Sequence, residues 1–399
     1  MLAFRLLAVF ALMMLLLWVR APLVPVIFGS SCLLAILYRL GPAALLTAFG
    51  QTLTDPATIE LEIVLVLIMS LEHLLGKHGY LERMLASLRR LLHNRRLLLA
   101  VLPALIGLMP SLGGALFSAP LVAQAAADTP LTPEEKSFVN YFYRHIWEYC
   151  LPLYPSLLIT ARVCGIPLAQ LIRNTVPYAL LVALLGIPVL RRIPVVKEHS
   201  STGYFLLARE VLINVSPVLA VVLMVLLLQV KIWAAVGLVV AVLMLRHRYT
   251  PFQALRLCRE ALQVKTLLLV LGIMFFKQII LETKAVDGLA YLLETLAIPE
   301  FVVFGTFGFL VGLITGTVSY SMGIIFPLVV AAAGGQVEMA LVVFVFVATF
   351  TGAMFTPMHL CLTLTVDFFK ADLRKVLKML ILPETALLSV ATALYVMFN

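Results

Sequence analysis

Arg144, His145 and Glu148 are three ionisable side chains within one short stretch of an otherwise apolar segment. A charge inside a membrane is costly, so each of these groups needs a partner or a role. Glu148 could bind a cation or exchange a proton, and His145 could titrate near neutral pH. The i,i+4 spacing of Arg144 and Glu148 fits a structural ion pair equally well.

A second set of polar residues lies around Gly316 and Pro357, and its members carry hydroxyl or imidazole groups. They are Thr315, Thr317, Ser319, Ser321, Thr356 and His359. These groups could bind a solute or an ion, although Ser and Thr in membrane helices often bond their own i−4 carbonyl. His359 corresponds in position to His145, and a hydrogen bond to a backbone carbonyl would explain it as well as a ligand would.

The first half of the chain has its own glycine-rich interruption and two further polar candidates. Gly113 and Gly114 would allow a tight turn with close backbone approach, and Ser111 adds a hydroxyl there. Asn140 and Tyr154, on either side of the charged stretch, are secondary candidates.

The composition indicates that all of these residues lie in a membrane protein. Of 399 residues, 63% are hydrophobic and 12% are charged, whereas soluble proteins have roughly 45–50% and about 25%. This balance excludes a soluble globule, a disordered chain, a coiled coil and a nucleic-acid-binding protein. We expect the net charge of +9 to reflect membrane topology. The five cysteines are scattered without CxxC or His-rich spacing, so neither disulfides nor a zinc site are expected.

Ten apolar segments predict membrane spans, at about 20 residues for each crossing. They are 2–19, 22–38, 57–76, 138–163, 171–190, 204–229, 231–245, 264–282, 339–365 and 377–398. The first is expected to be retained as a span, because no small-residue cleavage site follows Trp18.

Two more apolar segments, 97–127 and 301–334, are interrupted centrally by Gly, Pro, Ser and Thr. Each arm is too short to cross about 30 Å of hydrocarbon, so both segments predict re-entrant helical hairpins.

Two of the spans, 138–163 and 339–365, carry helix-breaking residues near their centres. These residues are Pro152, Pro155, Gly352 and Pro357. A proline inside a helix removes an amide donor and clashes with the preceding turn, so both spans are expected to break. The breaks would expose helix N-termini suited to an anion and carbonyls suited to Na⁺.

Most Lys and Arg residues gather in four segments. These are 77–96, 191–203, 246–265 and 366–378. The positive-inside rule places the four segments in the cytoplasm and both termini outside. The first and third are amphipathic, which fits either arms at the membrane interface or plain lipid-headgroup anchors.

The halves of the chain resemble each other at an offset of 205 residues. Gly107 to Met109 resembles Gly312 to Ile314, and Glu148 to Pro152 corresponds to Ala353 to Pro357. Five spans in each half require the second copy to be inverted, an architecture typical of secondary transporters. The predicted fold is therefore an all-α polytopic membrane protein of two inverted five-helix repeats, each with a re-entrant hairpin and a broken helix. The predicted repeats are 1–203 and 204–399.

The stretches 105–120, 140–149 and 152–155 resemble the signature of an uncharacterised prokaryotic integral-membrane family, known only as a domain of unknown function. That family is grouped with the ion transporter superfamily, beside gluconate permeases, arsenite permeases and divalent-anion/sodium symporters. The resemblance implies two inverted repeats with hairpins, a dimer and an elevator motion, but no particular substrate. Related dicarboxylate symporters carry Ser-Asn-Thr at their hairpin tips, and the absence of this Asn here argues against a dicarboxylate.

Together these features predict a secondary active transporter of a small anionic organic solute, a carboxylate or sugar acid, in a prokaryotic cytoplasmic membrane. Coupling to Na⁺ or H⁺ and an elevator-type mechanism are expected. No cofactor or metal is expected beyond Na⁺ at the hairpin tips, and the expected partners are the solute, membrane lipids and a second copy, not nucleic acid.

An intramembrane enzyme using His145 and Glu148, or a non-transporting scaffold, is the alternative. The chain has no HExxH or GxSxG motif, so the prediction is that it is not an enzyme and has no catalytic residues.

Overall fold

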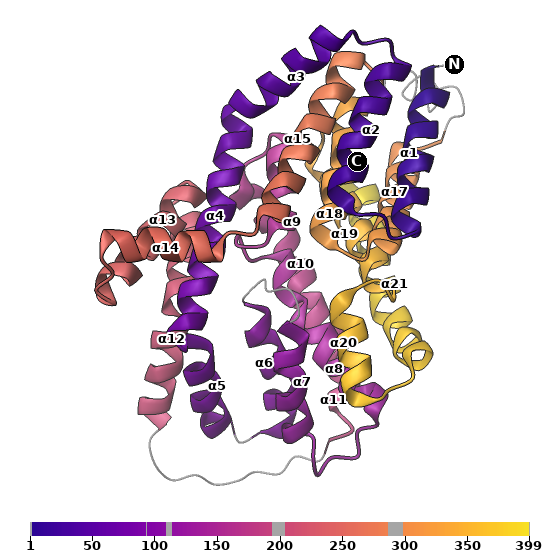
Figure 1. The fold of residues 1–399 in the computed structure, drawn as a ribbon. Helices are drawn as coiled ribbons and strands as arrows, with labels where there is room; N and C mark the ends of the chain where they lie inside the picture. Colours follow the sequence, from indigo (N-terminus) through magenta and orange to yellow (C-terminus); the bar gives the residue numbers. More distant parts are fainter. Residues whose placement is uncertain (1, 93, 109–113, 194–203, 286–297, 399) are drawn as a thin grey trace.

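The computed structural model describes residues 2–92, 94–108, 114–193, 204–285 and 298–398, and all regular structure in these ranges is helical (Figure 1). The helices of the first half are α1 (Leu2–Trp18), α2 (Leu23–Leu37), α3 (Pro42–Thr54), α4 (Pro56–Lys77), α5 (Tyr80–Leu91), α6 (Arg95–Gly107), α7 (Gly114–Ala125), α8 (Pro133–Arg144), the 3₁₀ helix η1 (Ile146–Tyr149), α9 (Pro155–Cys164), α10 (Leu168–Leu185) and α11 (Ile187–Leu190). Those of the second half are α12 (Tyr204–Leu226), α13 (Ile232–Arg246), α14 (Pro251–Ala261), α15 (Val264–Thr283), α17 (Glu300–Thr315), α18 (Val318–Ala332), α19 (Met339–Met354), α20 (Leu360–Phe369) and α21 (Leu373–Phe398).

Among the described residues, four helical stretches are long and apolar enough to cross a membrane: Leu168–Leu190, Tyr204–Leu226, Val264–Thr283 and Leu373–Phe398. Eight shorter apolar helices of 10–17 residues accompany them. Large apolar side chains remain exposed on these helices, such as Phe205 and Leu382. This exposure suits a lipid environment, where apolar side chains have no reason to turn inward. The described part of the chain is thus helical, with helices suited to crossing a membrane.

The helix breaks predicted from prolines are confirmed. Helix α8 ends at Arg144, one turn of η1 follows, and α9 begins only at Pro155. In the second half, α19 ends at Met354 and α20 begins at Leu360. Pro155 stands at the first position of α9, where a missing amide hydrogen costs nothing. The predicted spans 138–163 and 339–365 thus each consist of two short helices joined by irregular backbone.

The second predicted hairpin is formed by α17 and α18, which pack against each other around a turn at Gly316. Gly316 has a φ of +63°, the left-handed conformation that glycine adopts without strain. Helices α6 and α7 form the corresponding pair in the first half. Residues 109–113, which separate α6 from α7 in the sequence and include the predicted site residues Ser111 and Gly113, lie outside the described residues.

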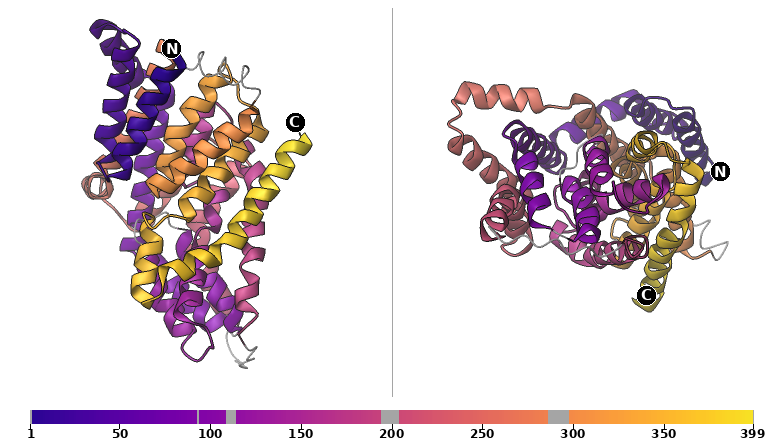
Figure 2. Two further views of the ribbon diagram at one scale, coloured as in Figure 1. Left: turned by 90° about the vertical axis from the view of Figure 1, so that its right-hand side faces the viewer. Right: turned by 90° about the horizontal axis from the view of Figure 1, so that it is seen from below.

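The two halves interlock. Helix α18 of the second half packs against α9 of the first, and α20 packs against α7 and α8. In Figure 1 the α6–α7 pair occupies the lower part of the molecule, while α17 and α18 occupy the upper part. The two broken helices thus meet between the hairpins. Seen from below, α12, α13 and α14 form a projecting edge on the opposite side from α21 (Figure 2).

Three features differ from the sequence prediction. Residues 42–54 form helix α3, although no element was expected there. Gly323 is one of the residues expected to interrupt the predicted hairpin 301–334, but it lies within α18, where the absent side chain leaves room for Ile273. Gly352 lies inside α19 and not in the break, because a side chain at Gly352 would collide with the backbone oxygen of Phe309 in α17.

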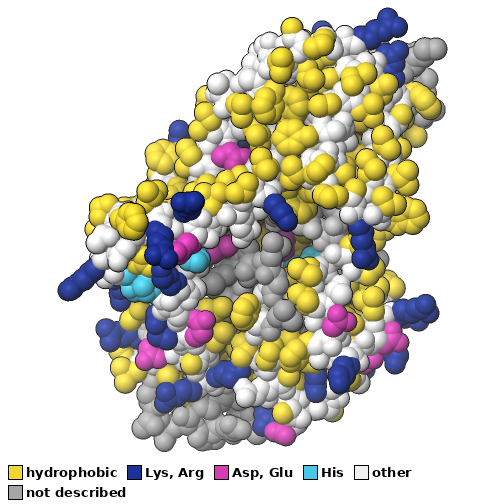
Figure 3. Space-filling model, viewed as in Figure 1, with side chains coloured by type: hydrophobic (Ala, Val, Ile, Leu, Met, Phe, Trp, Pro, Cys, Tyr) yellow, Lys and Arg dark blue, Asp and Glu magenta, His cyan; other side chains and the backbone are white. Residues whose placement is uncertain are grey.

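Charged and apolar side chains are distributed unevenly over the surface. On the face drawn in Figure 3, hydrophobic side chains dominate the upper part, whereas Lys, Arg, Asp and Glu gather in the lower part. Helix α14 carries the exposed side chains of Phe252 and Leu255 close to Arg256 and Arg259. This combination suits a helix that lies at a membrane–water interface.

Candidate functional site

A cavity of about 170 Å³ lies where the two helix breaks meet the turn between α17 and α18. The end of α8 and the first break contribute Arg144, His145, Glu148 and Tyr154. The turn and the start of α18 contribute Thr317, Ser319 and Tyr320. The second break and the start of α20 contribute His359 and Cys361. Glu72 of α4 and Gln263 and Thr266 near the start of α15 complete the polar lining.

Three helix N-termini border this cavity. Pro155, Val318 and Leu360 are the first residues of α9, α18 and α20, and all three line it. A helix N-terminus presents unpaired backbone amides and a partial positive charge, which favour an anion. The Arg144 guanidinium lies in the same wall and adds positive charge that favours an anion, while the carboxyl groups of Glu148 and Glu72 also line the cavity and oppose this effect.

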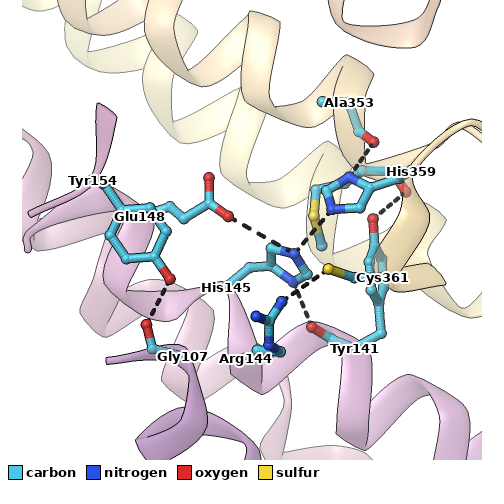
Figure 4. Close-up of polar contacts among 10 residues, drawn as sticks. Gly107, Tyr141, Arg144, His145, Glu148, Tyr154, Ala353, His359 and Cys361 are labelled. Carbon is cyan, nitrogen blue, oxygen red and sulfur yellow. Dashed lines mark hydrogen bonds and ion pairs between the residues drawn. The ribbon is translucent and has the colours of Figure 1, made fainter. Parts of the chain in front are cut away.

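His145 and His359 face each other across the two halves of the chain. Their Nε2 atoms are 3.1 Å apart, and their rings are nearly perpendicular (Figure 4). His145 Nδ1 bonds the Tyr141 carbonyl at 2.6 Å, and His359 Nδ1 bonds the Ala353 carbonyl at 3.1 Å. Both imidazoles are buried. They are held by backbone carbonyls of α8 and α19, so their orientation is fixed by the helices that end at the breaks.

Arg144 and Glu148 each extend toward this histidine pair from the first half. Arg144 Nη1 donates to Cys361 Sγ at 2.8 Å, and the Glu148 carboxylate lies 3.8 Å from His145 Nε2 (Figure 4). The i,i+4 spacing suggested an ion pair between Arg144 and Glu148. The structure instead directs Arg144 to the Cys361 sulfur and Glu148 to His145, so both groups take part in contacts around the junction of the two breaks.

Two tyrosines tie the breaks to the surrounding helices. The Tyr154 hydroxyl donates to the Gly107 carbonyl at the end of α6, at 2.6 Å. The Tyr141 hydroxyl donates to the Met354 carbonyl at the end of α19, at 3.3 Å. These bonds satisfy carbonyls that a helix end leaves without an intrahelical partner.

The hydroxyls around Gly316 divide into two groups. Thr315 Oγ1 and Ser321 Oγ lie 2.6 Å apart, and Ser321 also donates to the Thr317 carbonyl at 2.9 Å. Thr315 and Ser321 therefore brace the turn from inside, whereas Thr317 and Ser319 line the cavity.

Seven predicted site residues line the cavity: His145, Glu148, Tyr154, Gly316, Thr317, Ser319 and His359. Seven other predicted residues lie elsewhere among the described residues: Gly114, Asn140, Pro152, Thr315, Ser321, Thr356 and Pro357. Asn140 is buried between helices and donates to Thr365 Oγ1 at 2.9 Å. Thr356 Oγ1 accepts from the Met358 amide at 3.1 Å, which makes it a brace of the second break.

Cys361 is the cavity residue that sequence reasoning passed over most completely. It was counted among five scattered cysteines, yet it stands two residues after His359 at the start of α20. That His-x-Cys spacing beside a predicted break was the available signal. Lys277 of α15 donates to the Val163 carbonyl at 2.8 Å and lies outside this cavity.

The described part of the chain is helical, has helices long and apolar enough to cross a membrane, and holds a small polar cavity between two interrupted helices. Residues 3–397 match the protein family described as "Protein of unknown function (DUF401)", and the chain belongs to that family. No curated protein matches the chain.

Proposed function

We propose that this protein is a secondary active transporter of a small anionic organic solute, a carboxylate or a sugar acid. Transport is coupled to Na⁺ or H⁺ and proceeds by elevator-type alternating access. The observation that carries the proposal is the cavity built jointly by two helix breaks and a helical turn, bordered by three helix N-termini and Arg144. Irregular backbone at membrane depth is tolerated where it lines a cavity, and discontinuous helices form the substrate sites of secondary transporters.

An inverted repeat is the second element of the proposal, and helix boundaries support it. Corresponding helices begin 205 residues apart: α6 and α17 at residues 95 and 300, α9 and α20 at 155 and 360, and α10 and α21 at 168 and 373. This spacing is the offset at which the two halves resemble each other in sequence.

A pair of glycine contacts also recurs at this offset. A side chain at Gly107 would collide with the Arg144 carbonyl, and one at Gly312 would collide with the Thr349 carbonyl. Residues 107 and 312 are 205 apart, as are 144 and 349. In both halves, therefore, the first hairpin helix approaches the broken helix closely through a glycine at the same relative place, as two copies of one unit would.

The oxygen atoms at the breaks support Na⁺ as a coupling ion, and the positions of basic residues support an orientation in the membrane. The carbonyls freed at the breaks and the hydroxyls of Thr317 and Ser319 supply oxygen ligands of the kind that Na⁺ prefers. Helix α5, which carries Arg83, Arg89 and Arg90, lies at the opposite end from α1 and α2 (Figure 1). By the positive-inside rule this end is cytoplasmic. Both chain ends lie toward the other end (Figure 2), so both termini are outside. The functional unit is a homodimer in the cytoplasmic membrane.

A thermal-shift screen of the purified protein tests the proposal. Organic acids, sugar acids, amino acids and oxyanions are added with Na⁺ or with choline, and the unfolding midpoint is measured. A solute that binds the folded state raises the midpoint with the logarithm of its concentration. We expect one class of carboxylate to do so, and Arg144→Gln to lose the effect while Arg173→Gln, outside the cavity, keeps it. No shift by any anion across pH 5–8, with or without Na⁺, would contradict the proposal.

A further inference from the structure

The hydrogen bonds of His145 and His359 fix which nitrogen of each ring carries a proton. A backbone carbonyl only accepts, so the Nδ1 atoms that bond the Tyr141 and Ala353 carbonyls are both protonated. In the neutral imidazoles, each Nε2 then presents a lone pair. These two Nε2 atoms are the ones that lie 3.1 Å apart.

Two lone pairs cannot stabilise each other at this distance. Neither neutral Nε2 has a hydrogen to donate, so the contact is favourable only when a cation lies between the two nitrogens. A carbonyl bond on the second ring nitrogen is also the arrangement typical of histidines that ligate a metal, because it sets the tautomer and aims the free nitrogen. The pair is thus preorganised for a cation.

A third donor and a fourth group complete the surroundings. Cys361 Sγ and the two histidine nitrogens all lie within 4.8 Å of one another, and all three residues are buried. Arg144 Nη1 donates to this sulfur at 2.8 Å, which helps to hold Cys361 beside the histidine pair. The Glu148 carboxylate lies 3.8 Å from His145 Nε2.

The separations suit tetrahedral coordination. With Zn–N of about 2.05 Å and Zn–S of about 2.3 Å, tetrahedral ligands stand about 3.3 Å apart for two nitrogens and about 3.6 Å apart for nitrogen and sulfur. The two Nε2 atoms already stand 3.1 Å apart, so inward shifts of Cys361 and Glu148 would complete a tetrahedral set of four ligands.

We propose that His145, His359 and Cys361 bind a transition-metal ion of the Zn²⁺ class, with Glu148 as the fourth ligand. Imidazole and thiolate donors select such ions over Na⁺, Mg²⁺ and Ca²⁺, which prefer oxygen. A proton between the nitrogens would also be stabilised by the Glu148 carboxylate, but it would leave the Cys361 sulfur without a role. The metal joins the end of α8 to the start of α20 and therefore connects the two breaks across the halves of the chain.

Metal binding to the purified full-length protein tests this inference without any measurement of transport. Protein stripped by a chelator is titrated with Co²⁺, and Zn²⁺ is then used to displace it. We expect one Co²⁺ per chain, with the strong visible bands of a tetrahedral ion and a near-ultraviolet sulfur-to-cobalt charge-transfer band. Cys361→Ser removes the charge-transfer band and weakens affinity at least as much as the loss of an outer-shell partner does, which is about 10–100-fold. Cys164→Ser, which changes another buried cysteine, leaves both unchanged.

Absence of stoichiometric Co²⁺ and Zn²⁺ binding, or a spectrum that Cys361→Ser leaves intact, overturns the inference. If Cys361→Ser does not fold, X-ray absorption of the unaltered Zn²⁺-loaded protein decides the question. One sulfur with two imidazoles around the metal supports the site, and a shell of oxygen and nitrogen alone refutes it. Bound metal without solute flux would uphold this inference and count against the transporter proposal. Solute flux without bound metal would uphold the transporter proposal and overturn this inference.

Discussion

Replacement of Gly316 by alanine separates the geometry of the turn from the chemistry around it. Gly316 has a φ of +63°, and a Cβ there would lie 2.6 Å from the Met358 carbonyl carbon and 2.8 Å from the His359 amide nitrogen. Both neighbours are backbone atoms of the second break, so they cannot turn aside as a flexible side chain could. Either the turn at Gly316 must change its backbone conformation, or His359 must move.

The expected cost has two parts. A left-handed conformation costs a residue with a Cβ about 1–2 kcal/mol relative to glycine. Overpacking against fixed atoms adds about 1–3 kcal/mol. Gly334 provides a matched control, since its φ is +65° and a Cβ there would meet nothing within 4 Å. Gly334→Ala should therefore lose only the first part, and the difference between the variants measures the contact between the turn and the second break.

The assay is unfolding of purified protein by SDS titration, together with solute and metal affinity. We expect Gly316→Ala to lose about 1–3 kcal/mol more stability than Gly334→Ala. If the folded state accommodates the added Cβ, the same free energy appears as a loss of solute or metal affinity of about tenfold to hundredfold. Equal stability and equal affinity in the two variants would refute the packing of the turn against His359.

Three further predictions concern residues outside or at the edge of the cavity. Tyr154→Phe removes the hydroxyl that bonds the last carbonyl of α6 at 2.6 Å, and SDS unfolding should show a loss of about 1–3 kcal/mol, because a buried acceptor loses its partner. Asn140→Ala breaks the bond to Thr365; stability should fall by about 1–3 kcal/mol while solute affinity, measured by thermal shift, stays unchanged. Burial, followed by neighbouring positive charges, lowers the pKa of both His78 and His247, whose rings stack outside the spans. The unfolded chain then binds more protons than the folded one, so the unfolding midpoint should fall as pH drops through about 6.5. The fall should be less steep in His78→Gln. An unfolding midpoint that depends on pH in the same way in this variant would contradict the prediction.

Local chemistry made the helix breaks predictable. Pro152, Pro155 and Pro357 each lack the amide donor of a helix, and the structure breaks both segments beside them. Other prolines, such as Pro217 and Pro383, lie inside continuous helices, so a proline disfavours a helix without always ending it. The turn at Gly316 followed from the same kind of reasoning. Helix α3 was missed because its 13 residues include polar side chains and fall short of a span. Its signals were the Gly41-Pro42 and Asp55-Pro56 pairs, where proline occupies the first position of α3 and α4.

The composition of the site was less predictable than its location. Arg144 and Cys361 are 217 residues apart, and no periodicity within either helix indicates that their side chains meet. The sequence could place His145 just before the first break and His359 just after the second, but it could not show that their Nε2 atoms face each other. Asn140, conversely, was an attractive candidate because it is polar, yet its partner is a threonine of α20 and not the cavity.

Solute flux into proteoliposomes tests the central claim most directly. Liposomes containing the purified protein are given a radiolabelled carboxylate from the thermal-shift screen, with an inward Na⁺ gradient, an inward pH gradient or neither. The transporter proposal predicts accumulation above the external concentration under one gradient, loss of accumulation in Arg144→Gln, and normal accumulation in Arg173→Gln. Flux that never exceeds equilibration under either gradient, or that is the same in Arg144→Gln, would contradict the proposal.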